Sequence, residues 1–258
     1  MTSPKPIWPN GATAAISVTM DNMGEAADIH RGIWPKDEPV GNHHSVRERL
    51  PKMLDLLDQK QLKATYFVES WNCDVYPDTI KHVQSRGHEI GWHAFQHEVW
   101  SQLSPEQERE SFEKSFRNAD KDTLKWMKER GMRYLSPAAE REALVQDVAI
   151  VPFRWQDIDA YYYMSSTAPL RKGRGTVKIR SMSRSLAEEG GYISLLFHPF
   201  LTTGEERMKV MSDVLDHVKS KKDKVWCAPC NDVSDWIHEH PESFGSDPGW
   251  DNAEWKKK

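Results

Sequence analysis

Several features that would assign a protein to a specialised class are missing from this sequence of 258 residues. No stretch approaches the roughly 20 consecutive apolar residues that a membrane-spanning helix needs. The N-terminal segment MTSPKPIWPNGA has no apolar region of the kind that secretory signal peptides carry. The three cysteines are too few for a disulfide framework and fit a reducing compartment. We therefore expect a cytoplasmic protein that does not insert into membranes.

Excess positive charge is also absent. The formal net charge is -4 and the isoelectric point is about 6.3, whereas binding to nucleic acids or anionic membranes needs a basic surface. The sequence has no internal repeat, low-complexity tract or linker, so we expect one domain over residues 1–258. The sequence leaves open whether the chain forms a homo-oligomer.

What the chain does contain is an alternation of strand and helix patterns. Short apolar, β-branched runs predict strands at 13–20, 63–70, 88–93, 133–137, 148–155, 192–200 and 224–229. Apolar residues at helical spacing predict helices at 45–61, 76–87, 104–131, 204–222 and 232–240. This order indicates a parallel α/β fold, most simply a barrel.

Polar side chains follow three of these strands, where α/β proteins place their chemistry. Asp21 follows the first strand, His93 and His97 follow the third, and His198 ends a later one. Two histidines four residues apart on a helical turn can bind one metal ion. A histidine pair of this spacing is by itself a weak signal for a metal site. Asp21 could instead form a turn, and His198 could be a buried histidine of the core. The agreement of three strand ends favours a metal site.

Five segments together resemble the polysaccharide deacetylase superfamily (carbohydrate esterase family 4, with the NodB homology domain). They are ISVTMDN, ATYFVESW, GHEIGWHAFQHE, FRWQDID and LLFHPF, in the family's order and spacing. The N-terminal segment is similar to a branch that holds cytoplasmic peptidoglycan-deacetylase-like and allantoinase-like enzymes. The resemblance implies a single-domain α/β fold, a distorted (β/α)7-type barrel.

The resemblance also implies roles for individual residues. His93, His97 and Asn22 would bind a divalent metal ion, zinc. Asp21 would be the base that takes a proton from the attacking water, and His198 the acid that protonates the leaving amine. A carboxylate and an imidazole suit these roles near neutral pH.

Three further residues are candidates for substrate binding. Trp155 and Asp159 lie in FRWQDID, and the resemblance implies that Trp155 lines the pocket for the acyl methyl group. His44, in the loop GNHHSV, would touch substrate if that loop covers the mouth of the barrel. The alternative for this loop is an exposed turn with Ser45 as the cap of the next helix.

Two departures from the family pattern concern the metal and the base. Asn22 stands where the family has an aspartate ligand, so Asp21 could itself be the ligand and leave the base unassigned, with Glu25 as a distant candidate. The R-x-P-x-G motif, whose arginine steadies the catalytic aspartate, is missing; only FRNAD (116–120) begins like it.

The segment VWCAPC (225–230) has the spacing of a thioredoxin redox motif. A thioredoxin needs a further half-domain after this motif, so we expect Cys227 and Cys230 to be packing residues instead.

We predict a metal-dependent amide hydrolase with a small-molecule or oligosaccharide substrate, acting as an N-deacetylase of N-acetylated amino sugars or chitin-type oligomers. Two alternatives stay open. One is hydrolysis of a small cyclic amide, as in the allantoinase-like branch, and the other is a catalytically silent carbohydrate-binding homologue.

Overall fold

The computed structural model describes residues 7–99, 102–115, 133–164 and 191–249. They divide into two compact units. The first comprises Met1–Thr19, Arg133–Phe197 and Lys209–Lys258, and the second comprises Met20–Met132 and His198–Met208. The prediction of one domain over 1–258 stays a prediction.

The first unit is built on strand β1 (Ala14–Met20), which is hydrogen-bonded to β7 (Gly191–Phe197) and runs parallel to β8 (Val225–Cys227). A three-stranded sheet in the order β4 (Tyr134–Leu135), β6 (Val148–Ile150) and β5 (Ala143–Val145) stands beside helix α10 (Cys230–Glu239). Its other helices are α7 (Asp159–Tyr163) and most of α9 (Gly204–Lys219), with 3-10 turns η1 (Pro9–Gly11), η4 (Trp155–Asp157) and η7 (Pro241–Ser243).

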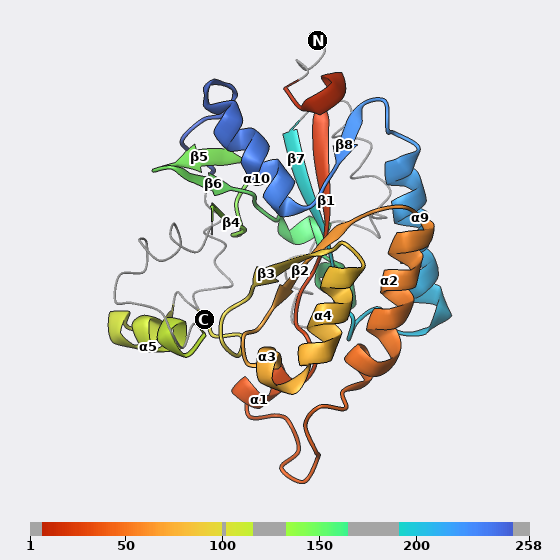
Figure 1. The fold of residues 1–258 in the computed structure, drawn as a ribbon, viewed down its shortest axis with the longest axis vertical. Coiled ribbons are helices and arrows are strands. Elements are labelled where there is room, and N and C mark those ends of the chain that lie inside the picture. The colour runs from red at the N-terminus through yellow and green to blue at the C-terminus, as the bar shows by residue number, and fades with distance from the viewer. Residues whose placement is uncertain (1–6, 100–101, 116–132, 165–190, 250–258) are drawn as a thin grey trace. The chain divides into compact units, whose positions relative to one another are not determined.

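The second unit holds a parallel pair, β2 (Ala64–Val68) and β3 (Glu89–Trp92), each preceded by a helix (Figure 1). These helices are α2 (Leu50–Gln59), which continues a π-helical turn η2 (Ser45–Arg49), and α4 (Pro77–Ser85). Shorter helices α1 (Ala26–His30) and α3 (Asn72–Val75) and the outer helix α5 (Pro105–Ser115) complete the unit.

The strands that consist mainly of apolar residues are buried on both faces. Every residue of β1 and of β2 is buried, as expected for parallel strands that are covered on both faces. On α2, Met53, Leu54 and Leu57 recur at helical spacing and are buried, so this stripe faces the core. The strands predicted at 13–20, 63–70, 88–93 and 192–200 are confirmed within three residues at each end.

The structure differs from the sequence-based expectation in several segments. The strand predicted at 148–155 ends at Ile150, and no helix was predicted where the structure forms α7. Strand β5 and helix α3 were not predicted, because each is only three or four residues long. The helix predicted at 104–131 is observed over Pro105–Ser115, and its continuation lies outside the described residues.

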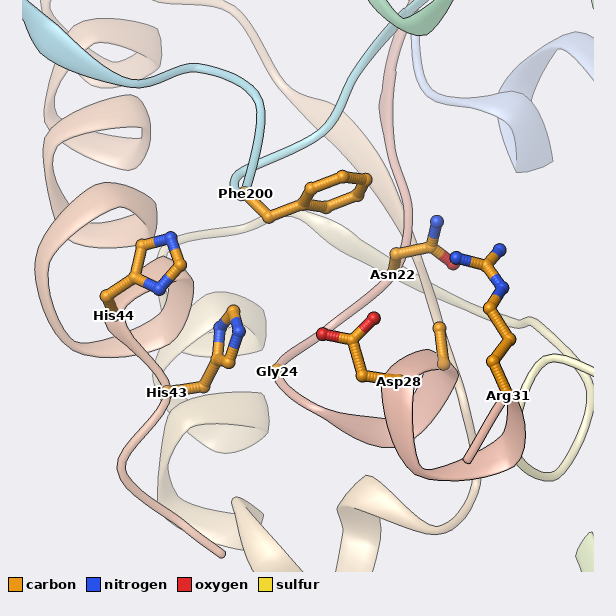
Figure 2. A pocket seen from close by; sticks show the side chains of 8 residues that line it. Asn22, Gly24, Asp28, Arg31, His43, His44 and Phe200 are labelled. Atoms are coloured by element: carbon orange, nitrogen blue, oxygen red, sulfur yellow. The ribbon is translucent and has the colours of Figure 1, made fainter. Parts of the chain in front are cut away.

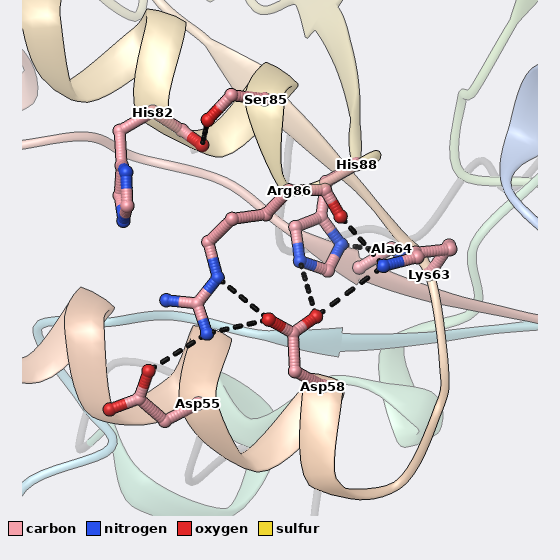
Figure 3. A network of polar contacts seen from close by, with 8 residues as sticks. All are labelled: Asp55, Asp58, Lys63, Ala64, His82, Ser85, Arg86 and His88. Carbon is pink, nitrogen blue, oxygen red and sulfur yellow. Dashed lines mark hydrogen bonds and ion pairs between the residues drawn. The ribbon is translucent and has the colours of Figure 1, made fainter.

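A polar network joins the helices to the amino ends of β2 and β3 (Figure 3). Arg86 contacts Asp55 and Asp58 of α2 at 2.8 Å, while Lys63 donates to the Arg86 carbonyl oxygen at 2.6 Å. His88 accepts a hydrogen bond from the Ala64 backbone N–H at 3.1 Å. The network fixes the end of the strand pair that is opposite to His93, which follows β3.

None of the described helices is long and apolar enough to cross a membrane.

Candidate functional site

The loop after β1 is held by buried polar contacts within the second unit. The Met23 backbone N–H donates to Glu69 Oε2 at 3.0 Å, and Asn72 Nδ2 donates to the Met23 carbonyl oxygen at 3.0 Å. Gly24 has a φ of 61°, and a Cβ there would lie 2.6 Å from the Tyr76 ring, so a larger residue would displace this loop. The position of Asp21 is therefore set by contacts with the residues that follow β2.

The two histidines after β3 come together, but on a tight turn rather than on a helix. Ala94 and His97 have positive φ values of 61° and 81°, which no helix contains. The carboxylate of Glu98 accepts hydrogen bonds from the backbone N–H groups of Phe95 (2.9 Å) and Gln96 (3.1 Å) and so closes the turn. The His93 and His97 ring centroids lie 5.0 Å apart.

Asp21 joins this histidine pair to His198. Its Oδ1 lies 2.8 Å from His198 Nε2, and its Oδ2 lies 3.8 Å from His93 Nε2. Burial acts to raise the pKa of Asp21, but the charge and hydrogen bond of His198, together with His93 and His97, lower it to about 2. Asp21 is therefore ionised at neutral pH. The structure thus brings together four of the predicted residues, from three separate segments of the chain.

Glu69 is a residue of this site that the sequence analysis missed. Its side chain is fully buried, and its Oε1 lies 3.3 Å from His93 Nδ1. Its Oε2 accepts hydrogen bonds from the Met23 N–H and from Asn72 Nδ2 (3.1 Å). A carboxylate at Nδ1 favours a proton on Nδ1. The lone pair of His93 Nε2, on the side of Asp21, is then available to a metal ion. The available signal was an acidic residue directly after the buried strand ATYFV.

Asn22 and His44 line a pocket next to this cluster, together with Phe200, whose ring centroid lies 5.1 Å from that of His198 (Figure 2). His44 is exposed, and its neighbour His43 is buried. Ser45 does not cap the following helix as expected but hydrogen-bonds the His43 ring at 2.7 Å. The prediction that His44 touches substrate is untested, and the pocket is where such a contact would occur.

Trp155 and Asp159 belong to the first unit. Trp155 begins η4 and packs edge-on against Phe153 at 5.6 Å, while Asp159 begins α7 and is buried. Between them, the buried Asp157 accepts a hydrogen bond from Arg154 Nε at 2.7 Å. Burial raises the pKa of Asp157 to about 6, against the opposing effect of Arg154.

The donor types of the cluster suit a divalent metal ion. Two donors on one tetrahedral zinc ion lie about 3.4 Å apart, close to the 3.8 Å between His93 Nε2 and Asp21 Oδ2. Burial lowers the pKa of His97 to about 4, so its imidazole is neutral and able to bind a metal. Within the described residues, however, no three His, Cys, Asp or Glu side chains form a preassembled metal cluster. The predicted zinc site stays a prediction, and the short distance to the histidines belongs to Asp21 rather than to Asn22.

The cysteine motif lacks the properties of a redox centre. Burial raises the pKa of Cys227 to about 12, and Cys230 is fully buried with its Sγ 3.6 Å from the Tyr192 hydroxyl. A redox dithiol needs a lowered thiol pKa. The structure therefore favours the packing role.

A family model described as polysaccharide deacetylase matches residues 37–141, which confirms the predicted resemblance. The segment contains Glu69, His93 and His97. Two peptidoglycan-N-acetylglucosamine deacetylases of Bacillus cereus are 34% identical over 62 residues and 35% identical over 79 residues. These matches cover 24% and 31% of this chain but only 22% and 35% of those proteins.

Solved structures match nearly the whole chain. A Mycobacterium smegmatis protein named as a polysaccharide deacetylase aligns with a TM-score of 0.70 and 21% identity, covering 93% of this chain and 96% of that one. The PuuE allantoinase aligns with a TM-score of 0.70 and 17% identity, covering 92% and 94%. These matches confirm the fold class, an α/β fold of the distorted (β/α)7-barrel type.

Proposed function

We propose that this chain is an amide hydrolase of the polysaccharide deacetylase type, which removes the acetyl group from N-acetylated amino sugars or chitin-type oligomers. The observation that carries the proposal is that Asp21 lies 2.8 Å from His198 and 3.8 Å from His93, a residue of the segment that matches the family. A buried carboxylate paired with an imidazole can move a proton in each direction.

In this proposal the two proton transfers of the reaction are carried out by two different residues. Asp21, ionised at neutral pH, accepts a proton from the water that attacks the acetamide carbonyl. His198 donates a proton to the nitrogen of the leaving amine, which otherwise departs as a poor leaving group. The 2.8 Å contact between Asp21 Oδ1 and His198 Nε2 orients both groups toward the same space.

A divalent ion, zinc in the prediction, would be held by His93, His97 and an oxygen of Asn22 or Asp21. When bound, it would supply Lewis acidity at the amide carbonyl. Trp155 and Asp159 stay proposed substrate-binding residues, and cytoplasmic location and oligomeric state stay predictions.

A cyclic-amide hydrolase is the second candidate. It is favoured by Asn22, which stands where the deacetylases have a charged ligand. The fold does not distinguish the two, because the allantoinase and the M. smegmatis protein align with the same TM-score.

The test is a direct comparison of substrates with purified protein. Acetate release from N-acetylglucosamine oligomers supports the deacetylase. Ring opening of allantoin or of a cyclic imide, without acetate release, supports the second candidate. Binding of the oligomer with neither reaction, in zinc-loaded protein, would show a silent carbohydrate-binding homologue and contradict both.

A further inference from the structure

The pocket beside His198 has a volume of about 120 Å³, and His43 is one of the residues that line it (Figure 2). His43 is only 7% exposed. A buried polar side chain costs free energy unless its polar atoms find partners. The two ring nitrogens of His43 meet this requirement in different ways.

Ser45 holds one of the two nitrogens. Its backbone N–H donates a hydrogen bond to His43 Nδ1 at 3.2 Å, and its Oγ lies 2.7 Å from the same atom. A backbone N–H can only donate, so Nδ1 carries no proton and the Ser45 hydroxyl donates to it as well. The proton of the neutral ring is then on Nε2. Ser45 thereby fixes the tautomer of His43.

The backbone of His43 is fixed by a second set of contacts. Its N–H donates to the Tyr76 hydroxyl oxygen at 2.9 Å, and that hydroxyl donates to the buried Glu25 Oε2 at 2.6 Å. The Trp34 ring packs beside the His43 ring, with the two centroids 5.5 Å apart. A flip of the imidazole that exchanged its nitrogens would break the contacts with Ser45. The ring is therefore held in one orientation.

The His43 ring is neutral at pH 7. Burial and the nearby His44 lower its pKa below the usual 6.5, and they outweigh Glu25 and Asp28, which raise it. A protonated ring would also carry a hydrogen on Nδ1 and lose the hydrogen bond from the Ser45 N–H. The ring therefore offers an N–H donor without a positive charge.

The other nitrogen, Nε2, is the atom that can meet a ligand. It forms no hydrogen bond with any residue in the described ranges. It is not sealed in the core either, because the ring lines the pocket. A histidine that serves only to pack the core would have both nitrogens bonded within the protein. In His43 one nitrogen is held by Ser45 and the other opens on the pocket.

We propose that His43 is a fixed, neutral hydrogen-bond donor whose Nε2–H binds a carbonyl oxygen of the amide substrate, with Ser45 as its positioning residue. A neutral donor suits a neutral acceptor, since a carboxylate or phosphate would be bound better by a cation. A donor that is already oriented needs no rearrangement when the substrate arrives. The choice of an amide rests on the proposed function, but the acetamide and the cyclic amide both carry such an oxygen.

The tautomer is tested by NMR on protein that is labelled with nitrogen-15 in its histidines. Long-range proton–nitrogen spectra distinguish the two neutral tautomers from each other and from the imidazolium, and the signals lost in His43→Asn identify His43. We expect the Nε2–H form in wild type at pH 7. Ser45→Ala should populate the Nδ1–H form as well, whereas a serine that only supports the fold would leave the tautomer unchanged. An Nδ1–H form or an imidazolium in wild type at pH 7 would overturn the proposal.

Binding is measured by calorimetry or ligand-observed NMR with N-acetylglucosamine and with hydantoin. His43→Asn keeps an acceptor near the position of Nδ1 but does not reach the position of Nε2. It should weaken the tighter of the two ligands about 5- to 10-fold, the effect of one hydrogen bond. His43→Gln carries an N–H of longer reach and should stay within about 3-fold of wild type.

The positioning role of Ser45 has a matched control. Ser45→Ala should weaken binding about 2- to 3-fold, because part of the ring population then presents no Nε2–H. Ser85→Ala on α4 removes an exposed hydroxyl that donates to the His82 carbonyl oxygen at 2.8 Å. This control should change neither the tautomer of His43 nor the affinity.

Failure of the donor is distinguishable from failure of the deacetylase. Equal affinities of wild type and His43→Asn would overturn the donor role, and so would the absence of binding of both ligands to wild type. The predicted affinities and tautomers without acetate release from metal-loaded enzyme would uphold the donor and overturn the deacetylase. Acetate release with equal affinities in wild type and His43→Asn would overturn the donor alone.

Discussion

At the scale of single residues, two fully buried glutamates of the second unit make similar contacts but have different neighbours. Glu69 accepts two hydrogen bonds and lies 3.3 Å from His93 Nδ1. Glu25 accepts hydrogen bonds from the Tyr76 hydroxyl (2.6 Å) and from the Gly41 N–H, neither of which belongs to the turn that carries His93 and His97. A comparison of the two separates an effect on His93 from a general effect of burial.

Glu69→Gln should weaken metal binding by about 10- to 100-fold, the effect of removing a carboxylate that orients a histidine ligand. Metal affinity, measured by competition with a chelator, checks this without any activity assay. Glu25→Gln is the matched control: both variants should lose some stability, but only Glu69→Gln should lose metal affinity. Equal affinities in the two variants would mean that Glu69 has a structural role only.

Glu69 also shows a limit of inference from sequence. Asp21, His93, His97 and His198 could be predicted because each follows a strand and each has a matching motif. Glu69 follows β2 in the same way, but its role depends on the rotamer of His93, which no motif reports. The positive φ of His97 is equally invisible in the sequence, so a helical turn was expected where the chain forms a tight turn closed by Glu98.

At the scale of elements, His88 links β2 and β3 and responds to pH. Its side chain is fully buried at 4.0 Å from Asp58 Oδ1 (Figure 3). Burial, with the charge of Lys63, lowers its pKa to about 4 from 6.5. Between pH 6.5 and pH 4 the unfolded chain therefore binds more protons than the folded one, and folding stability falls as the pH falls.

We expect His88 alone to remove on the order of 3 kcal/mol of stability across this interval, since one pKa unit corresponds to about 1.4 kcal/mol. His88→Gln keeps an acceptor for the Ala64 N–H but cannot titrate, so its stability should depend less steeply on pH. Urea unfolding at pH 7, 5.5 and 4.5 measures the slope. His82→Gln, an exposed histidine of α4, should keep the wild-type slope, and an unchanged slope in His88→Gln would contradict the assignment.

The turn between β8 and α10 carries the cysteine motif, and its burial predicts low reactivity. With a pKa of about 12, Cys227 should react with iodoacetamide at pH 8 at least ~100-fold more slowly than a free cysteine. Cys73, which is exposed, serves as an internal control, and all three thiols should react in denaturant. Fast labelling of Cys227 in the folded protein would return the redox interpretation to consideration.

At the scale of the whole molecule, the fold class could be predicted and the boundaries could not. The long apolar strands 13–20, 63–70 and 192–200 have strong patterns because they are buried on both faces. The small sheet was predicted only in part: β4 and β6 lie within the strands predicted at 133–137 and 148–155 but are shorter, and β5 has too few residues for a period to be recognised. Its presence depends on tertiary contacts with α10 that act beyond any local sequence window.

The pocket beside His198 was only partly foreseen for the same reason. His44 could be suspected from its loop, whereas Asp28 lies in the short helix α1 and Arg31 directly follows it, where the sequence has no motif. They reach the pocket because α1 follows directly on the loop that carries Asp21 and Asn22. Two neighbouring residues of that loop therefore lie in different sites: Asp21 belongs to the carboxylate–histidine cluster, and Asn22 lines the pocket.

The most direct test of the central claim is the rate of acetate release from N-acetylglucosamine oligomers by metal-loaded wild type, Asp21→Asn, His198→Gln and His82→Gln. If Asp21 and His198 carry the proton transfers, each of their variants should lose at least about 100-fold in kcat, with sugar affinity retained. The exposed His82→Gln should match wild type. Wild-type rates in Asp21→Asn and His198→Gln would contradict the proposed reaction centre.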